Sequence, residues 1–260
     1  MPPMEIVTKN NDRLFVFTDL DDTLFASLKK SQVIENLTPA TVDVNGEHYA
    51  YSSVQQQKLL NIMIKSDAII IPVTGRRSSS FLNCKLPCIM NSLYSVVSHG
   101  AVILDAQHQL LNEWVIFLEQ QFNLMQWKVT LTTLHQHLFN YAEKLNNGIR
   151  VRLIVDQGIT TYLCIKINKE NAHQLALIEL NDYLQSILPA NMLLHANGRN
   201  FAILPPYAQK KVAVDFLKQK MNVGSLDTVL GIGDSHSDLA FMQESDFLIV
   251  PQKAQIFEHK

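Results

Sequence analysis

The chain has 260 residues, of which 47% are hydrophobic and 18% are charged, and its formal net charge is −2. This balance is typical of a globular protein with one large domain or two small ones. The nearly neutral charge gives no electrostatic footprint for nucleic acid or for a membrane surface. No apolar run approaches the ~18–20 residues needed to span a bilayer. We therefore expect neither nucleic acid nor a membrane as a partner.

The cysteines and the first residues bear on the cellular compartment. Cys84, Cys88 and Cys164 cannot all pair, and no second cysteine cluster completes a zinc site with them. We expect buried or inactive thiols in a reducing compartment. Residues 1–6, Met-Pro-Pro-Met-Glu-Ile, lack the basic region and apolar stretch of a secretory signal. These features predict a cytoplasmic protein, either a monomer or a small homo-oligomer.

Residues 14–23 read Leu-Phe-Val-Phe-Thr-Asp-Leu-Asp-Asp-Thr, an apolar run that ends in carboxylates. The run predicts a buried strand. Asp19 and Asp21 lie two positions apart, so their side chains point the same way at the carboxyl end of that strand, where α/β sheets bind ligands. Two close carboxylates repel each other unless one is protonated or a cation lies between them. The spacing therefore predicts acid–base chemistry, a divalent metal, or both.

The next elements extend this pattern. Residues 41–51 hold Asn45-Gly46 between alternating side chains, which predicts a hairpin. A helix follows, with Ser52 or Ser53 as its cap. Residues 68–73 form a short apolar run that is typical of a buried parallel strand, although Pro72 is unfavourable inside a central strand. This strand delivers Thr74-Gly75-Arg76 at its end.

The middle of the chain has a different composition of elements, with paired strands and amphipathic helices. We expect strands at 95–98, 101–104, 149–155, 160–167, 192–195 and 200–204, a mostly helical but broken stretch at 114–146, and a helix at 171–187. The chain then returns to alternation, with a helix at 208–221, a strand at 228–232, a helix at 237–243 and a strand at 247–250.

Alternating strands and helices at both ends of the chain indicate a parallel sheet covered by helices. The middle is more like an α+β module inserted into that α/β domain. We therefore expect a discontinuous core of residues 1–104 and 205–260, with an inserted domain of residues 105–204. The two crossings are expected near 104–111 and 204–208.

Four separated signals carry the chemistry. They are Asp19-Leu20-Asp21-Asp22-Thr23, Thr74-Gly75-Arg76, Lys210 at the start of a helix, and Gly231-Ile-Gly-Asp234-Ser-His-Ser-Asp238. Each signal is weak alone, but their order is specific, and it resembles the haloacid dehalogenase superfamily of phosphotransferases. The run from Gly198 to Val214 is similar to that of sucrose-phosphate phosphatase-like and Cof-like sugar phosphatases with a type-2 cap. The resemblance implies a Rossmannoid parallel-sheet core, with residues 105–204 as an α+β cap domain.

The residues themselves suit phosphate-ester hydrolysis. Asp19 can attack phosphorus and form an aspartyl-phosphate, while Asp21 can protonate the leaving alcohol and then deprotonate water. Thr74 and Lys210 can stabilise charge on the phosphoryl oxygens. Asp234 adds a carboxylate for a hard cation such as Mg²⁺. The resemblance implies the same roles, with a backbone metal contact from Asp21. The expected site is Asp19, Asp21 and Asp234 for Mg²⁺; Thr74, Gly75 and Lys210 for phosphate; and Thr23 and Asp238 in support.

Two positions depart from the pattern of the superfamily. Ser237 stands where an asparagine is usual, and its shorter side chain loosens the positioning of metal-bound water. Lys211 follows Lys210 where glycine is usual, which leaves two lysines for one role. We favour Lys210, because Ala213 and Leu217 then match the register of the family.

For the remaining candidate residues we favour a structural or solvent-exposed role over a catalytic one. Arg76 and Arg77 are expected to form ion pairs or to face solvent rather than to contact substrate, His236 has no catalytic role, and Trp114 and Trp127 are expected to pack. Six residues of the inserted domain could contact a sugar or a second phosphate, although a structural or solvent-exposed role is favoured for each: Arg150, Arg152, His195, Asn197, Arg199 and Asn200.

The favoured function is a Mg²⁺-dependent phosphomonoesterase that acts on a small phosphorylated metabolite, with a sugar phosphate preferred. A sugar phosphomutase is the enzymatic alternative, because related proteins with this cap return the phosphoryl group to a sugar. A degenerate member that serves as a binding or regulatory module is the alternative from another class, supported by Ser237 and Lys211 alone.

Overall fold

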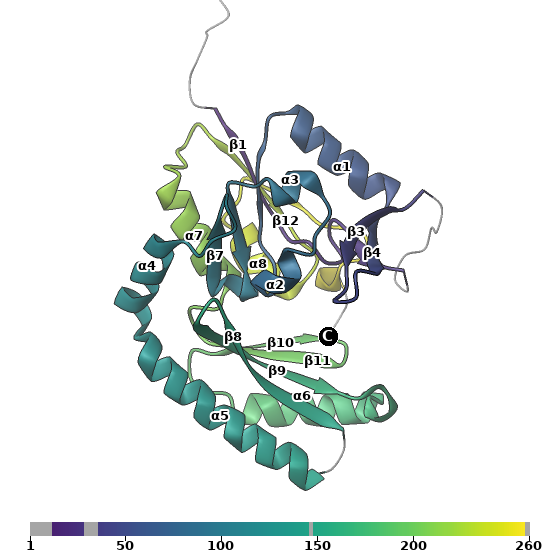
Figure 1. The fold of residues 1–260 in the computed structure, drawn as a ribbon, viewed down its shortest axis with the longest axis vertical. Coiled ribbons are helices and arrows are strands. Elements are labelled where there is room, and N and C mark those ends of the chain that lie inside the picture. Colours follow the sequence, from purple (N-terminus) through teal and green to yellow (C-terminus); the bar gives the residue numbers. More distant parts are fainter. Residues whose placement is uncertain (1–11, 29–35, 146–147, 258–260) are drawn as a thin grey trace, which may run out of the picture. The chain divides into compact units, whose positions relative to one another are not determined.

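The computed structural model describes residues 12–28, 36–145 and 148–257 (Figure 1). Residues 1–6, on which the prediction about a secretory signal rests, lie outside these ranges. The chain divides into two units, which are described separately. The first unit holds residues 1–72, 85–93 and 217–260, and the second holds residues 73–84 and 94–216.

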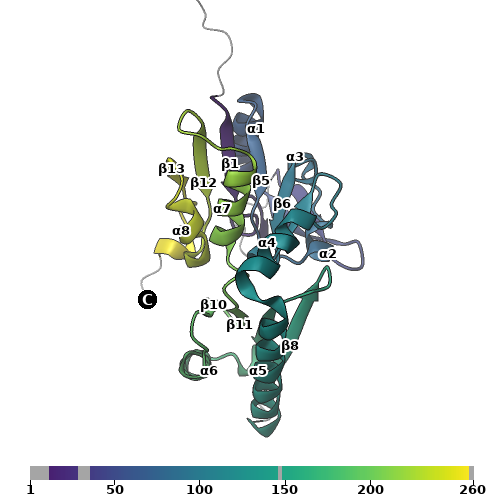
Figure 2. The ribbon, with the colours of Figure 1, turned by 90° about the vertical axis from the view of Figure 1, so that its left-hand side faces the viewer.

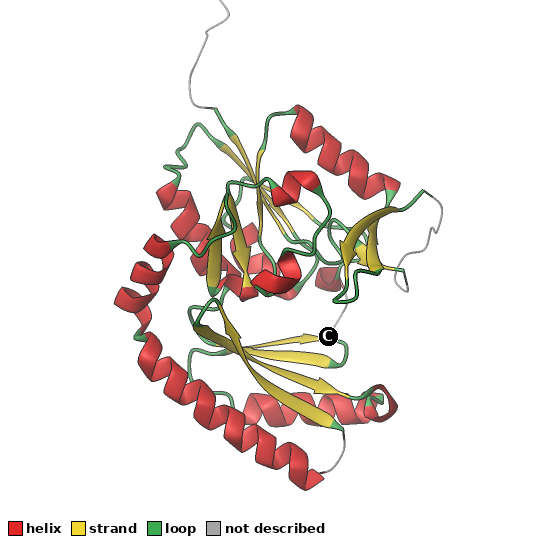
Figure 3. Cartoon of the chain, viewed as in Figure 1, coloured by secondary structure: helices red, strands yellow, loops and turns green. Residues whose placement is uncertain are grey.

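A parallel sheet of four strands forms the centre of the first unit (Figure 3). Its order is β13 (Phe247–Ile249), β12 (Thr228–Ile232), β1 (Leu14–Thr18) and β5 (Ile69–Pro72). Every residue of β1 after Leu14 is fully buried, because this apolar strand has neighbours on both edges. Thr18 lies opposite Ile232 on one side and Pro72 on the other, so these three strands end at the same level. The predicted mixed α/β fold with a parallel sheet is confirmed.

Pro72 fits this sheet without breaking it. It is the last residue of β5, and β5 is the end strand of the four. Proline has no amide hydrogen, but at this position its absence removes no hydrogen bond between strands in the interior of the sheet. The position explains how the proline that was unfavourable for a central strand is accommodated.

The loop after β1 is held by its neighbours in the first unit. The hairpin of β3 (Thr38–Val42) and β4 (His48–Ser52) confirms the predicted turn, with Gly46 at a φ of 82°; β2 (Ala26–Ser27) pairs with β4. Helix α1 (Val54–Lys65) begins with a capping box between Ser53 and Gln56. The Gln56 side-chain amide also donates to the Thr23 carbonyl at 3.0 Å, so the helix start supports the loop that carries the aspartates. The remaining elements wholly in this unit are α3 (Pro87–Met90), α8 (His236–Met242) and the 3₁₀ turn η3 (Gln255–Phe257).

The second unit is built on an antiparallel sheet. Its order is β10 (Leu193–Asn197), β11 (Asn200–Leu204), β9 (Ile159–Ile167) and β8 (Ile149–Asp156). Helices α5 (Leu124–Leu145) and α6 (Gln174–Ser186) lie on the same side of it in Figure 1, and Figure 2 shows α5 lengthwise and α6 nearly end-on. Leucines of both helices form one core with the inward side chains of β9 and β11.

The rest of the second unit contains shorter elements. They are α2 (Ser78–Phe81), β6 (Tyr94–Val97), the 3₁₀ turn η1 (Ser98–Gly100), β7 (Val102–Asp105), α4 (Asn112–Phe122) and η2 (Lys169–Asn171). The predicted break in the long helical stretch falls at Asn123, whose φ of 44° is left-handed and separates α4 from α5. Helix α7 (Lys210–Lys220) is divided between the units after Phe216. Within the described ranges, no helix has the length and apolar composition needed to cross a membrane.

Candidate active site

Three aspartates gather at the carboxyl end of the parallel sheet in the first unit. Asp19 directly follows β1, and Asp234 comes two residues after the end of β12. The Asp19 amide donates to the Ile232 carbonyl at 2.8 Å, which ties the two strand ends together. One carboxylate oxygen from each of Asp19, Asp234 and Asp238 lies within 4.8 Å of the others. The first and last sequence signals, more than two hundred residues apart in the chain, therefore meet here.

Hydroxyl groups orient these carboxylates. The Thr23 hydroxyl donates to Asp19 Oδ2 at 3.2 Å and lies 3.4 Å from Asp234 Oδ1. Asp238 is fully buried, and its Oδ2 accepts from the Ser235 amide at 3.0 Å and from the Ser235 hydroxyl at 2.7 Å. This pair caps the start of α8. The group is thus held rigidly by short-range contacts.

Ser237 and Gly233 also have defined places in this group. The Ser237 hydroxyl lies 2.8 Å from the Ser235 hydroxyl, so the residue that replaces the usual asparagine joins the hydrogen bonds around Asp238. A Cβ at Gly233 would lie 2.5 Å from the Asp238 Cβ, which explains why glycine stands between β12 and Asp234.

The donor set of this cluster fits Mg²⁺. Three nearby carboxylates with little exposure repel one another without a cation, and Mg²⁺ prefers oxygen ligands and retains several waters. Asp238 already accepts two hydrogen bonds from Ser235, which suits a supporting position better than direct coordination. Asp19 and Asp234 are then the carboxylates that would hold a metal.

Asp21 lies in the turn after Asp19, and its carboxylate is not a member of the cluster. The Leu20 carbonyl accepts the amides of Leu24 and Phe25 at 2.9 and 3.2 Å, while Asp22 adopts a left-handed φ of 61°. This tight turn leaves Asp21 half-buried.

In the second unit, Thr74, Gly75 and Lys210 are all linked to His99, Thr74 through the His99 backbone and the other two through its imidazole. The Thr74 carbonyl accepts the His99 amide at 3.1 Å, and a Cβ at Gly75 would lie 2.5 Å from the His99 ring. Lys210, 6% exposed at the start of α7, interacts electrostatically with the same imidazole. The three residues expected to bind phosphate are therefore gathered within one unit.

No motif in the sequence pointed to His99 itself. Its φ of 58° is left-handed, its ring packs against Tyr162 and His195 at centroid distances of 5.0 and 5.5 Å, and its buried Nδ1 has no hydrogen-bond partner among the described residues. Burial, with a smaller contribution from His195 and Lys210, holds the pKa of His99 well below its usual value. The imidazole is therefore neutral at neutral pH.

A further buried carboxylate joins the tip of the β8–β9 hairpin to the rest of the second unit. Asp156 accepts from the Ser78 amide at 2.8 Å, from the Ser78 hydroxyl, and from the Ser98 hydroxyl at 2.6 Å. In the sequence, Asp156 only follows the strand expected at 149–155, and no role was expected for it. The contact fixes the turn η1 that carries His99.

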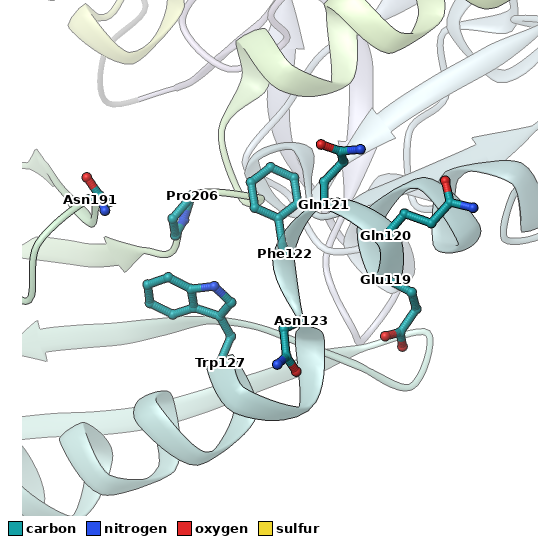
Figure 4. Close-up of a pocket in the computed structure, with 8 residues that line it drawn as sticks. All are labelled: Glu119, Gln120, Gln121, Phe122, Asn123, Trp127, Asn191 and Pro206. Atoms are coloured by element: carbon teal, nitrogen blue, oxygen red, sulfur yellow. The ribbon is translucent and has the colours of Figure 1, made fainter.

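An open groove of about 530 Å³ lies elsewhere in the second unit, beside the junction of α4 and α5. In Figure 4 the rings of Phe122 and Trp127 lie toward Pro206, whereas Glu119 and Gln120 point away. Trp127 also packs against the core of this unit, as predicted. Among the described residues that line the groove, none forms a nucleophile–base pair, so the groove is not a candidate for catalysis.

Comparison with solved structures gives the same fold. A sucrose-phosphatase from Synechocystis sp. PCC6803, in complex with sucrose and phosphate, has 14% identity and a TM-score of 0.56, with 94% of this chain and 85% of that chain covered. The C-terminal domain of trehalose-6-phosphate phosphatase from C. albicans has 15% identity and a TM-score of 0.53, with coverages of 89% and 73%. A haloacid dehalogenase-like hydrolase from B. subtilis has 11% identity and a TM-score of 0.51, with coverages of 92% and 95%.

These likenesses confirm the expected core fold with an inserted cap domain. No curated protein matches the sequence. The family model of sucrose-6F-phosphate phosphohydrolase matches residues 12–255, which is nearly the whole chain and includes all four sequence signals. The chain therefore belongs to the sucrose-6F-phosphate phosphohydrolase family, which consists of phosphatases of the haloacid dehalogenase type.

Proposed function

We propose that this protein is a Mg²⁺-dependent phosphomonoester hydrolase whose substrate is a small phosphorylated metabolite, with a sugar phosphate preferred. The observation that carries the proposal is the cluster of Asp19, Asp234 and Asp238 at the carboxyl end of β1 and β12. A match to a phosphohydrolase family over residues 12–255 supports the same chemistry.

Hydrolysis then follows two displacements at phosphorus. A carboxylate oxygen of Asp19 attacks phosphorus while the bond to the ester oxygen breaks, and Asp21 gives its proton to the leaving alcohol. Asp21 next takes a proton from water, and the water oxygen attacks phosphorus as the bond to Asp19 breaks. Inorganic phosphate leaves and both aspartates return to their starting states. When bound, Mg²⁺ offsets the negative charge that otherwise keeps the carboxylate and the phosphate dianion apart.

The second unit contributes groups for the phosphoryl oxygens in this proposal. The Thr74 hydroxyl and the Lys210 ammonium donate to them, and Gly75 allows a close backbone approach. The burial of Lys210 strengthens its attraction for a dianion relative to a lysine in water. We further propose that residues 105–204 act as the cap that selects the leaving group.

The compartment and the partners follow from the substrate. Phosphorylated metabolites are anions that do not cross a bilayer unaided, so we propose that the enzyme works in the cytoplasm where they are formed. It is proposed to act as a monomer or small homo-oligomer, without nucleic acid or membrane.

A phosphate-release screen tests the proposal. The wild-type protein is incubated with a panel of phosphorylated metabolites, with Mg²⁺ or with a chelator, beside Asp19→Asn and the control Asp22→Asn. Asp22 has a left-handed φ of 61°, which asparagine tolerates, so this control changes a neighbouring carboxylate without straining the turn. We expect Mg²⁺-dependent release by wild type and by the control, and nearly complete loss in Asp19→Asn.

Other outcomes decide between the alternatives. Residual activity of Asp19→Asn within about tenfold of wild type would exclude Asp19 as the nucleophile. An isomeric sugar phosphate in place of free phosphate would identify a phosphomutase. If wild type with Mg²⁺ turns over no member of the panel, the result favours the alternative of a binding or regulatory module most.

A further inference from the structure

One face of the sheet in the second unit carries uncompensated positive charge. Strand residues alternate between faces, and the core with α5 and α6 takes residues such as Leu163, Ile165 and Phe201. As far as the register shift after Ile154, the opposite face therefore carries the alternate residues of the four strands, and none of these is acidic: Arg150, Arg152, Ile154, Tyr162, Cys164, Lys166, Leu193, His195, Asn197, Asn200, Ala202 and Leu204.

Four cations of the second unit gather around Cys164 on this face. The register places Arg150 directly opposite Lys166, and Arg152 directly opposite Cys164. Arg152, Lys166, Arg77 and Arg150 all act electrostatically on the Cys164 thiol. We call Arg77, Arg150, Arg152 and Lys166 the cationic cluster. Within the described part of the chain, none of their side chains forms an ion pair or a hydrogen bond.

This arrangement suits an anionic ligand, because the three arginines of the cluster are exposed and Lys166 is partly exposed. Like charges directly opposite each other destabilise an antiparallel pair. The chain has 24 acidic residues, two more than its lysines and arginines together, yet Asp156 at the end of β8 is the only one in these four strands. The nearby Asp156 carboxylate is already engaged by Ser78 and Ser98. The charge of the cluster is thus left for a ligand.

The cluster is continuous with the residues proposed to bind phosphate. Arg77 comes two residues after Gly75 in the chain. Tyr162 lies two positions from Cys164 on β9, about 7 Å along the strand, and its ring contacts His99, which packs on Gly75. The path from Gly75 through His99 and Tyr162 to Cys164 remains within one unit. The length of this path is comparable with that of a small metabolite.

We propose that the substrate carries, besides the phosphate that is hydrolysed, a second anionic group that the cationic cluster binds. This inference rests on the proposed function and narrows its substrate class to phosphorylated sugar acids and sugar bisphosphates. Three guanidinium groups and an ammonium match carboxylate or phosphate oxygens, and arginine binds either anion in a bidentate manner. A sugar phosphate with hydroxyl groups alone leaves these cations without a partner.

Matched substrate pairs test the inference. Sorbitol 6-phosphate and 6-phosphogluconate are both open chains. The first ends in a hydroxymethyl group where the second ends in a carboxylate. Glucose 6-phosphate and glucose 1,6-bisphosphate differ by the second phosphate, so the two pairs distinguish the two kinds of anion. The measured quantity is the ratio of kcat/KM between the members of each pair, with the full chain and Mg²⁺. We expect wild type to favour the more anionic member of at least one pair by about tenfold or more.

Variants connect this preference to the cluster. Arg152→Ala and, separately, Arg150→Ala should each lower the ratio several-fold, mainly through KM. Lys128→Ala removes an exposed cation from α5, outside the cluster, and should keep the ratio of wild type. Dissociation constants measured with Asp19→Asn, which binds substrate without turning it over, give the same ratio independently of catalysis.

The results that would overturn the inference differ from those that would overturn the proposed function. A wild-type ratio near one in both pairs and in both measurements overturns the inference, as does an equal change in Arg152→Ala and Lys128→Ala. Absence of phosphate release from all four compounds counts against the proposed function, while the binding ratio still decides on the cationic cluster.

Discussion

Lys210 and Lys211 are neighbours in the chain but have different surroundings. Lys210 is buried beside His99, whereas Lys211 is partly exposed and forms an ion pair with Asp215 at 2.8 Å, one turn later in α7. An exposed pair of this kind contributes little to stability. A buried ammonium, by contrast, retains its full attraction for a phosphoryl group.

The two lysines therefore give a matched pair of variants. Lys210→Ala should lower kcat/KM for phosphate release by about 10²–10³, the usual cost of removing one group that stabilises charge in the transition state. Lys211→Ala should stay within about threefold of wild type. Steady-state kinetics with one substrate measure both, and the reverse order would assign the role to Lys211.

Among the individual site residues, those that directly follow buried strands could be predicted from the sequence. Asp19 and Asp234 come together because apolar runs of fixed length deliver them to the same edge of a parallel sheet. His99 could not be predicted in this way. Its position depends on a left-handed backbone and on Gly75 leaving space for its ring, and both are products of tertiary packing.

Among the elements, the β8–β9 hairpin is fastened at its tip. Asp156 is nearly buried and accepts hydrogen bonds from Ser78 and Ser98, so its removal leaves those donors without a partner. We expect Asp156→Ala to lower the free energy of unfolding of the second unit by about 3 kcal/mol, and Asp156→Asn to cost less because its amide oxygen still accepts. The exposed Asp182→Ala should change it by less than about 0.5 kcal/mol.

Tryptophan fluorescence during urea unfolding is the suitable measurement. Both tryptophans, Trp114 and Trp127, belong to the second unit, so the signal reports on that unit alone. Equal effects of Asp156→Ala and Asp182→Ala would show that the contact does not stabilise the hairpin.

Most elements were predictable from local patterns, but their pairing was not. The Asn45-Gly46 hairpin, the capped helix α1 and the break near the middle of 114–146 follow from turn residues, caps and periodicity. The order β10-β11-β9-β8 depends on contacts between distant segments, which local propensity does not encode. The face on which the cationic cluster lies appears only once that register is known.

For the whole molecule, topology explains why distant signals can serve one reaction. The order β13-β12-β1-β5 places the first strand beside a strand near the end of the chain, as parallel connections through helices allow. The insertion between them forms the second unit with its own core. The division into a core of 1–104 and 205–260 with a cap of 105–204 stays a prediction. Family membership and fold agree with the chemistry expected from four short signals.

The most direct test of the account is detection of a phosphoryl group on Asp19 during turnover. With p-nitrophenyl phosphate and Mg²⁺, the leaving group needs no proton, so Asp21→Asn should still form the aspartyl-phosphate but hydrolyse it slowly. Mass spectrometry of acid-quenched Asp21→Asn should then find the modification on Asp19, and Asp19→Asn should show none. A phosphoryl group on another residue, or normal turnover by Asp19→Asn, would contradict the account.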